Sequence, residues 1–195
     1  MNRPYSMTAR ADAASSTKDR IARAGLELLL KHSYEEVTLA AIAAAAGVSH
    51  QTVLNHFKNK EGVVFGAAEV FKQQTEPARR AAKPGDLPGA VRALVGEYER
   101  AGDVNVRWAV TSERVPELAQ VLAEARASHQ GWIVELFGEQ LPAAPAARRR
   151  AIHAAHAATD VYTWKLLRRD LGLSRAETEK IMADLLRGAL KGADR

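Results

Sequence analysis

Apolar residues recur along most of this chain at the three- and four-residue spacing of an α-helix, and no segment of useful length alternates apolar and polar residues. Ile21, Ala24 and Leu28 begin one such stripe, and Ile181, Leu185 and Ala189 belong to another. Glycine, proline and helix-capping residues separate the stripes. The pattern predicts an all-α protein of about nine helices without an internal repeat.

Helix-breaking and helix-capping residues divide the chain into predicted helical segments. Residues 1–16 are small and polar and carry no apolar stripe, so we predict a flexible tail followed by a helix from Thr17. A later helix is expected to end near Pro77, because proline disrupts a helix interior. One long helix is expected over residues 146–171. Ser174 and Glu177 form a capping box for the last helix.

Composition removes several classes of protein. The chain has no cysteine, which excludes disulfides, thiolate zinc sites and cysteine nucleophiles. It has neither a secretory signal nor an apolar run near the ~20 residues that span a bilayer, so we expect a cytoplasmic protein without membrane contact. The net charge is +5, and residues 1–60 hold eight Lys/Arg against five Asp/Glu. This balance permits a polyanionic partner without requiring one.

Residues 39–58 have the pattern of a helix-turn-helix motif. Such a motif needs a small residue where the two helices cross, a glycine in the turn and an apolar residue that locks the second helix. Ala43, Gly47 and Val53 meet these needs in order. Thr38 and Ser49 stand where the N-caps of the two helices belong.

The flanking residues resemble the N-terminal domain of the TetR family of transcriptional regulators, over about 45 residues from Arg20 through Val64. The resemblance rests on the following residues: Arg20-Ile21, Ala24, Tyr34, Val37-Thr38, Ile42-Ala43, Ala46-Gly47-Val48-Ser49, Thr52, His56-Phe57 and Lys60-Glu61. Two positions depart from the family: Ser33 replaces the usual glycine, and Leu54 replaces the usual tyrosine, which often contacts the DNA backbone. The division is then a tail (1–16), a DNA-binding domain (17–62) and an effector-binding and dimerisation domain (63–195).

The second helix of the motif is expected to enter the major groove of DNA by its N-terminal turn. Gln51 and Asn55 are the first candidates for reading base edges, because an amide can form two hydrogen bonds with adenine. Ser49 would direct backbone N–H groups at a phosphate. The resemblance implies backbone contacts for Thr38 and His56. The predicted DNA contacts are, together: Thr38, Ser49, His50, Gln51, Thr52, Asn55, His56 and Lys60.

No sequence motif of an enzyme competes with this interpretation, and we expect neither a catalytic site nor a cofactor. Glu97 and Glu99 cannot share one helix face, because residues two apart diverge. His153, His156 and Asp160 would share a face of the long predicted helix. They could ligate a metal, contact a polar effector or form a packed polar stripe; we expect no metal there.

The second domain is expected to form a homodimer, as the resemblance also implies. We expect it to bind an apolar or aromatic small molecule, because apolar residues outnumber charged ones among its candidate contacts. Residues Ile152, Ala155, Thr159, Tyr162 and Leu166 form a second face on the long predicted helix, which together with the last helix could form the dimer seam. The candidate effector contacts are the following: Phe71, Tyr98, Trp108, His129, Trp132, His156, Asp160 and Tyr162.

These observations predict a homodimeric repressor that leaves a palindromic double-stranded DNA operator when an effector binds. An activator or an effector-free regulator is the alternative within the class. An all-α enzyme or metal-binding bundle with an incidental helix-turn-helix is the alternative from another class.

Overall fold

The computed structural model describes residues 7–191, and this part of the chain is helical throughout, as predicted. Two compact units divide it, one ending at Gln74 and the other beginning at Thr75. None of the described helices is long and apolar enough to cross a membrane.

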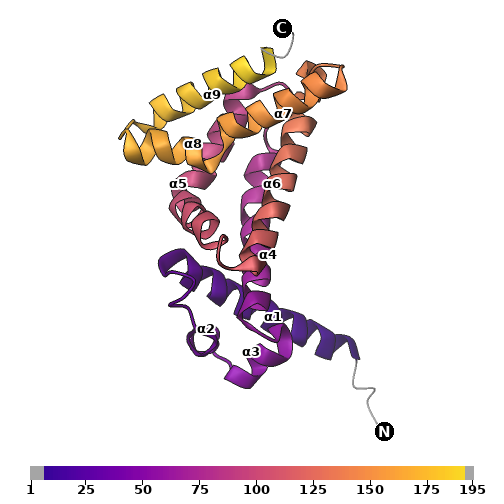
Figure 1. The fold of residues 1–195 in the computed structure, drawn as a ribbon. Coiled ribbons are helices and arrows are strands. Elements are labelled where there is room, and N and C mark those ends of the chain that lie inside the picture. The colour runs from indigo at the N-terminus through magenta and orange to yellow at the C-terminus, as the bar shows by residue number, and fades with distance from the viewer. Residues whose placement is uncertain (1–6, 192–195) are drawn as a thin grey trace. The chain divides into compact units, whose positions relative to one another are not determined.

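In the first unit, α1 (Met7–Lys31) packs on α2 (Leu39–Ala46), and α2 packs on α3 (His50–Phe57), as Figure 1 shows. Ile21, Leu29 and Val53 are among the most deeply buried side chains of this unit. A Cβ on Gly25 of α1 would lie 2.6 Å from Val63 Cγ1, so α1 approaches the start of α4 (Lys60–Arg80) closely.

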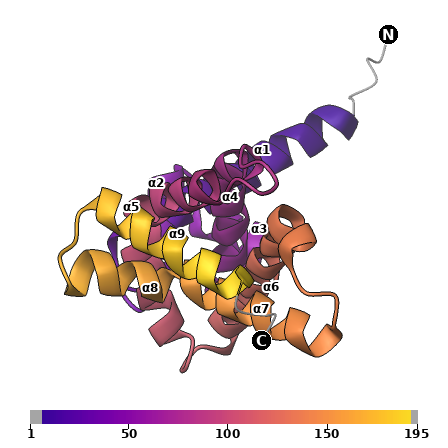
Figure 2. The same ribbon diagram turned by 90° about the horizontal axis from the view of Figure 1, so that it is seen from above.

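The predicted tail over residues 1–16 is wrong from Met7 onward, where α1 begins. Residues 7–16 contain four alanines and neither glycine nor proline, so they favour a helix even without an apolar stripe. Figure 2 shows the first turns of α1 extending away from α2 and α3, which explains why the sequence lacks that stripe. Residues 1–6 of the predicted tail lie outside the described residues.

The boundary between the two units also differs from the predicted one at residues 62 and 63. It falls inside α4, which continues through Pro77 to Arg80. The first turns of α4 pack within the first unit, since a Cβ on Gly66 would lie 2.6 Å from the ring of Phe57. Val63, Val64 and Ala67 are buried there. Helix α4 therefore contributes residues to both units.

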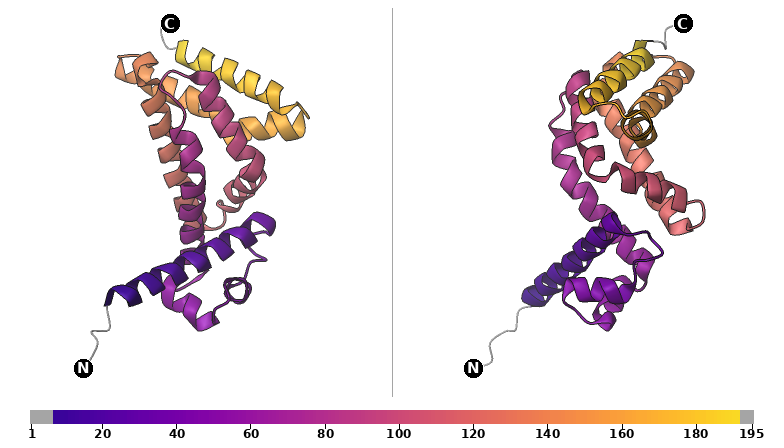
Figure 3. Two further views of the ribbon diagram at one scale, coloured as in Figure 1. Left: turned by 180° about the vertical axis from the view of Figure 1, so that it is seen from behind. Right: turned by 90° about the vertical axis from the view of Figure 1, so that its left-hand side faces the viewer.

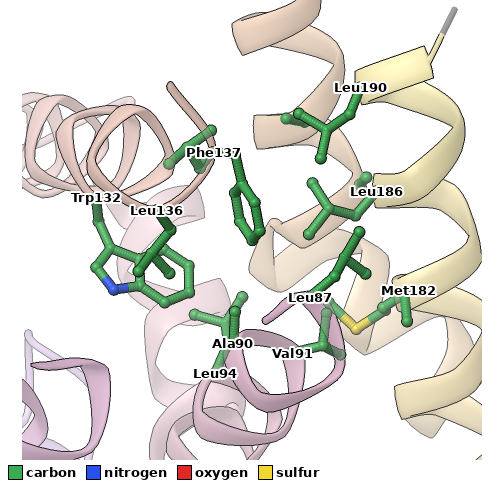
Figure 4. Packing of buried hydrophobic residues seen from close by; sticks show 14 of the residues in the cluster. Leu87, Ala90, Val91, Leu94, Trp132, Leu136, Phe137, Met182, Leu186 and Leu190 are labelled. Atoms are coloured by element: carbon green, nitrogen blue, oxygen red, sulfur yellow. The ribbon is translucent and has the colours of Figure 1, made fainter. Parts of the chain in front are cut away.

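The second unit contains α5 (Leu87–Thr111), α6 (Pro116–Phe137), α7 (Pro145–Thr159), α8 (Val161–Lys165) and α9 (Arg175–Lys191). A 3₁₀ turn (Gly138–Gln140) follows α6, and a π-helical segment (Leu166–Asp170) follows α8. Helix α9 packs along α5 and α7 (Figure 3). Figure 4 shows Met182 and Leu186 of α9 directed toward Leu87 of α5 and Phe137 of α6, so these helices share one apolar core.

The long helix predicted over residues 146–171 is wrong, because it breaks at Asp160. This residue has an extended backbone (φ −74°, ψ 153°), and its carboxylate accepts a hydrogen bond of 2.9 Å from the Tyr162 backbone N–H. The acid therefore caps a new helix, α8, in a stretch without glycine or proline. The break ends the register of α7, so the faces predicted for one continuous helix do not continue into α8.

Two arginines of the π-helical segment bind acids of α5. Arg168 donates to both carboxylate oxygens of Glu99 (2.6 and 3.0 Å), and Trp164 Nε1 also donates to Glu99 (3.0 Å). These bonds hold the pKa of Glu99 below its usual range, with the Arg168 bond as the largest cause. Arg169 binds Asp103 of the next α5 turn. The segment after α8 is thereby fixed on α5.

Gly102 of α5 lies directly under the buried Trp164 ring, and a Cβ there would be 2.3 Å from Cζ3. We expect Gly102→Ala to lower the free energy of unfolding by about 1–3 kcal/mol, because the fully buried indole has no free space to move into. Urea denaturation measures this. Gly131→Ala on α6 is the matched control, since nothing lies within 4 Å of its Cβ. The control should be neutral or stabilising; equal losses in both variants would contradict the packing argument.

Candidate DNA-binding surface and effector cluster

The turn between α2 and α3 has the geometry that the sequence predicted. Thr38 Oγ1 accepts a hydrogen bond from the Ala41 N–H (3.1 Å), and Ser49 Oγ accepts one from the Thr52 N–H (3.1 Å). Gly47 ends α2 with a φ of +63°, a conformation that costs glycine little. Each short helix thus has its own N-cap, and these bonds join residues no more than four apart.

The residues expected to lock the two helices together are buried as predicted. Ala43 of α2 and Val53 of α3 lie in the core of the first unit, together with Ile42 and Ala46. Burial of this apolar side fixes which side of α3 remains at the surface. That surface carries the polar residues of α3.

His50, Gln51 and Asn55 are exposed on α3, whereas Thr52 and His56 are half-buried. Gln51 Nε2 donates a hydrogen bond to Asn55 Oδ1 (3.0 Å), so the two amides stand one helical turn apart on one face. Thr38 is exposed at the start of α2. The structure thus leaves the predicted base-reading side chains accessible on α3.

Lys60 is more constrained than the sequence suggested. Its ammonium donates a hydrogen bond to the Tyr34 carbonyl and lies 3.9 Å from the centre of the Tyr34 ring. Partial burial lowers the pKa of Lys60, against the opposing effect of nearby Glu35 and Glu61. An ammonium has three N–H donors, so two remain for a phosphate after the bond to Tyr34.

The structure shows the local surroundings of Ser33 and Leu54, the two residues that depart from the family pattern. Ser33 donates from both its backbone N–H (2.9 Å) and its hydroxyl (3.0 Å) to Glu36, whose pKa these bonds lower. The serine therefore stabilises the turn before α2 through its side chain. Leu54 is half-buried on α3 and has no hydrogen-bonding group to offer a phosphate.

A polar cluster lies inside the second unit, centred on Arg79 and Glu97. Arg79 at the end of α4 donates to both carboxylate oxygens of Glu97 on α5 (2.7 and 3.0 Å). A further Arg79 N–H bonds His129 Nδ1 on α6 (3.3 Å). The side chain of Glu97 is only 6% exposed. A buried ion pair is tolerated when its hydrogen bonds are well formed, and the two bonds between Arg79 and Glu97 meet that condition.

His129 connects this ion pair to α7. Because its Nδ1 accepts from Arg79, its Nε2 carries the proton and donates to Thr159 Oγ1 (2.8 Å). Thr159 in turn donates to the Ala155 carbonyl, and its own carbonyl accepts from the Tyr98 hydroxyl (3.0 Å). Burial, aided by the Arg79 charge, lowers the pKa of His129 to about 3, so the ring is neutral. Burial raises the pKa of Tyr98.

His156 and Asp160 lie beside His129. The His156 ring meets the His129 ring edge-on with centres 4.9 Å apart, and its Nε2 lies 3.2 Å from Asp160 Oδ2. Gln130 Nε2 lies 3.2 Å from His156 Nδ1. Trp132 stacks on His129 with ring centres 5.7 Å apart. The cluster therefore combines charged groups, two imidazoles and an indole.

Five of the eight predicted effector contacts thus come together in the second unit, namely Tyr98, His129, Trp132, His156 and Asp160. Trp108 is buried on α5, ten residues after Tyr98 and so roughly 15 Å further along the helix. Tyr162 is 46% exposed, because the break at Asp160 turns it outward. Phe71 is half-buried in the unit that ends at Gln74. These three residues do not join the cluster.

The predicted triple of His153, His156 and Asp160 is also incomplete. His153 is exposed, and only His156 and Asp160 pair. Within residues 7–191, no group of three or more His, Asp or Glu side chains is arranged to hold a metal ion. Glu97 and Glu99 diverge as expected, Glu97 to Arg79 and Glu99 to Arg168.

Sequence reasoning missed Arg79, Glu97, Gln130 and Thr159. Arg79 follows the proline at which a helix end was expected, and Thr159 looks like an ordinary member of a helix face. A signal was present only for Glu97, an acid placed among the apolar residues Val91, Leu94 and Val95 of the α5 stripe. A charged residue within such a stripe is buried only with a partner, but its partner is not evident from the sequence.

Comparison with known proteins supports the helix-turn-helix interpretation of the first unit. A model of bacterial regulatory proteins of the tetR family matches residues 21–67. The transcriptional regulator TcmR of Streptomyces glaucescens is 33% identical over 85 residues, which cover 41% of this chain and 38% of that protein. The chain spans less than two fifths of the length of the curated relatives that it matches.

Two solved structures share the fold over most of the chain. A transcriptional regulator from Rhodococcus sp. Rha1 has a TM-score of 0.71 at 19% identity, covering 91% of this chain and 98% of that one. EbrR, described as a multidrug binding protein and solved in complex with imidazole, has a TM-score of 0.63 at 16% identity, covering 95% and 93%. These TM-scores support the fold of both units. Residues 21–67 therefore match the tetR family of bacterial regulatory proteins, and both units share their fold with solved regulators.

Proposed function

We propose that this chain is a DNA-binding transcriptional regulator, a homodimeric repressor that a small-molecule effector releases from a palindromic operator. The exposed polar face of α3, held by two capped helices, is the observation that carries the proposal. The named relatives are transcriptional regulators, which favours this function over an all-α enzyme or a metal-binding bundle. A cytoplasmic location follows from the proposal, since the operator DNA lies there.

On the DNA, Gln51 and Asn55 would read base edges in the major groove. Ser49 would direct the free N–H groups at the start of α3 toward a phosphate. Thr38, His56 and Lys60 would contact the sugar-phosphate backbone. His50 and Thr52 would border the same groove. Each of these side chains is exposed or half-buried in the first unit, as such contacts require.

A mobility-shift assay with duplex DNA from upstream of the chain's own gene tests this function. We expect a specific complex that an excess of unlabelled operator abolishes and an excess of scrambled duplex leaves intact. Equal competition by both duplexes would indicate unspecific binding to a basic protein. A complete lack of binding would favour the enzyme or bundle alternative.

The dimer would form through α8, the π-helical segment and α9. Four large apolar side chains stand about half exposed there, namely Tyr162, Leu166, Leu171 and Leu185. A stable seam should bury at least ~1,000 Å² in total. In light scattering at micromolar concentration we expect twice the 21.2 kDa of one chain. Leu166→Glu with Leu185→Glu should shift the mass toward the monomer, and a wild-type mass of one chain would contradict the proposal.

The effector would bind at the polar cluster of the second unit. Arg79 belongs both to that cluster and to α4, the helix that begins at Lys60 of the first unit. An effector that prefers a different placement of α4 would change the spacing of the two recognition helices in the dimer. DNA affinity would fall by no more than the difference in the effector's affinity for the two states. The description of EbrR as a multidrug binding protein supports a small-molecule effector.

A further inference from the structure

The chain passes from α3 to α4 through two residues, Lys58 and Asn59. The Asn59 backbone N–H donates to the Phe57 carbonyl (2.6 Å), and Lys58 between them has a φ of +62° and a ψ of −47°. This is a γ-turn of the strained type, with a positive φ at its central residue. Among the described residues, Lys58 is the one non-glycine residue with a positive φ. The connection therefore concentrates backbone strain at Lys58.

The residues around the turn hold it in this tight form. Asn59 Oδ1 accepts a hydrogen bond from the Gly62 N–H (2.9 Å) in the first turn of α4. A Cβ on Gly62 would lie 2.1 Å from the Phe57 carbonyl oxygen, so α4 begins directly against the end of α3. A glycine at position 58 would adopt the positive φ at little cost, but the chain has a lysine there. An exposed residue in a strained conformation points to a function of its side chain.

Lys58 also lies on the side of α3 that carries Gln51. Its N–H donates to the Leu54 carbonyl (2.8 Å), as in a continued helix, so its Cα lies one turn after Leu54 and two turns after Gln51. Its side chain is exposed and forms neither an ion pair nor a hydrogen bond with another described residue. Lys60, by contrast, uses one N–H on the Tyr34 carbonyl. All three N–H donors of the Lys58 ammonium are thus available to a ligand.

We propose that Lys58 is a further DNA contact, whose ammonium binds a phosphate of the DNA backbone at the C-terminal end of α3. This inference rests on the proposed function, in which α3 enters the major groove. Leu54 has no hydrogen-bonding group to offer a phosphate, and Lys58 provides a polar contact one turn further along. The strain of the γ-turn is then a loss of stability that accompanies a gain in DNA affinity. A phosphate contact carries no sequence information, so Lys58 strengthens binding to every duplex.

Lys58→Gln tests the contact, because it removes the charge and keeps a side chain at the positive φ. Binding to operator and scrambled duplexes at several salt concentrations measures the effect. We expect the slope of log K against log [salt] to fall by roughly 1 in each subunit. The affinity for both duplexes should fall about eightfold for each lost contact at about 0.1 M salt, because one contact changes K with about the 0.9 power of the salt concentration. Lys58→Arg keeps the cation and should keep the wild-type slope.

Lys58→Gly separates the strain from the charge. This variant and Lys58→Gln both lack the cation, but only glycine relieves the strain at the positive φ. We therefore expect the thermal unfolding midpoint of Lys58→Gly to lie about 2–4 °C above that of Lys58→Gln. Both variants should lose the same DNA affinity. If Lys58→Gly is no more stable than Lys58→Gln, or binds both duplexes as the wild type does, the proposal is wrong.

Lys31→Gln is the matched control for the loss of one positive charge. Lys31 is exposed on α1, thirteen residues or roughly 20 Å after Lys18, whose ammonium lies 5.7 Å from the centre of the Phe57 ring at the end of α3. The control should keep the wild-type slope. An unchanged slope in Lys58→Gln would leave Lys58 only a favourable interaction with the dipole of α3 and would overturn the proposal. An equal fall in Lys31→Gln, or a loss of affinity for the operator alone, would also overturn it.

The binding of the wild-type chain separates this inference from the proposed function. If the wild-type chain binds its operator specifically and Lys58→Gln has an unchanged slope, the regulator function stands and the Lys58 contact is wrong. If it binds both duplexes equally and the slope falls in Lys58→Gln but not in Lys31→Gln, the contact stands and sequence-specific regulation fails. A lack of binding to either duplex would overturn both.

Discussion

Replacement of Glu97 by glutamine should lower the free energy of unfolding by about 3–5 kcal/mol, because it leaves a buried guanidinium without its counter-charge. The amide would offer Arg79 one acceptor and no negative charge where the native carboxylate offers two oxygens at 2.7 and 3.0 Å. The loss should lie toward the lower end of this range, because the Arg79 side chain keeps 20% of its surface in solvent. Urea denaturation measures the difference in free energy of unfolding. The slope of this free energy against urea concentration should be unchanged.

Two comparisons show whether the cause is the uncompensated charge. Glu76→Gln breaks the exposed pair of Glu76 and Arg80 on the same helix and should cost less than about 1 kcal/mol. Arg79→Met combined with Glu97→Met removes both charges and should recover most of the stability lost in Glu97→Gln. If Glu97→Gln costs no more than Glu76→Gln, the pair of Arg79 and Glu97 is not effectively buried.

The second large expected effect is on the affinity for operator DNA. Gln51→Ala should weaken operator binding by about 1–3 kcal/mol in each subunit and leave binding to a scrambled duplex nearly unchanged, because a base contact carries sequence discrimination. Binding to both duplexes at several salt concentrations measures this. The exposed position of Gln51 on α3 makes a large loss of folding stability unexpected.

Lys60→Met is the comparison for an unspecific contact, because methionine can keep the apolar contact with the Tyr34 ring while losing the charge. This variant should weaken both duplexes similarly and flatten the slope of log K against log [salt] by roughly 1 for each lost contact in each subunit. If Gln51→Ala weakens both duplexes equally, or Lys60→Met affects the operator alone, then α3 does not enter the groove in the orientation proposed.

The candidate DNA surface could be predicted from the sequence because the bonds that form it are local. Thr38 and Ser49 cap helices through residues three positions away, and Gly47 reverses the chain within the turn between them. The offsets of the helix-turn-helix pattern also predicted that Ala43 of one helix and Val53 of the next would be buried. In each case the partners are near in sequence, so residue type and offset are sufficient information.

The break at Asp160 shows where local information becomes ambiguous. The segment 146–171 has no glycine or proline at the break, and its helical pattern continues on both sides of Asp160. The aspartate can lie within a helix or cap a new one. The packing of Trp164 against Gly102, and the bonds of Trp164 and Arg168 to Glu99, favour the break, because they place α8 on α5. These partners are more than sixty residues away in the chain.

By itself, the sequence determined the helical class, the helix-turn-helix unit with its exposed polar face, and the set of aromatic and histidine residues from which an effector cluster could form. Only the tertiary structure decided which of them meet. Arg79 finds Glu97 eighteen residues away, and His129 finds Thr159 thirty residues away. A buried charge or hydroxyl needs a hydrogen-bonding partner when water is removed. The residue type shows that a partner is needed but does not identify it. The packing of α4, α5, α6 and α7 selects the partner.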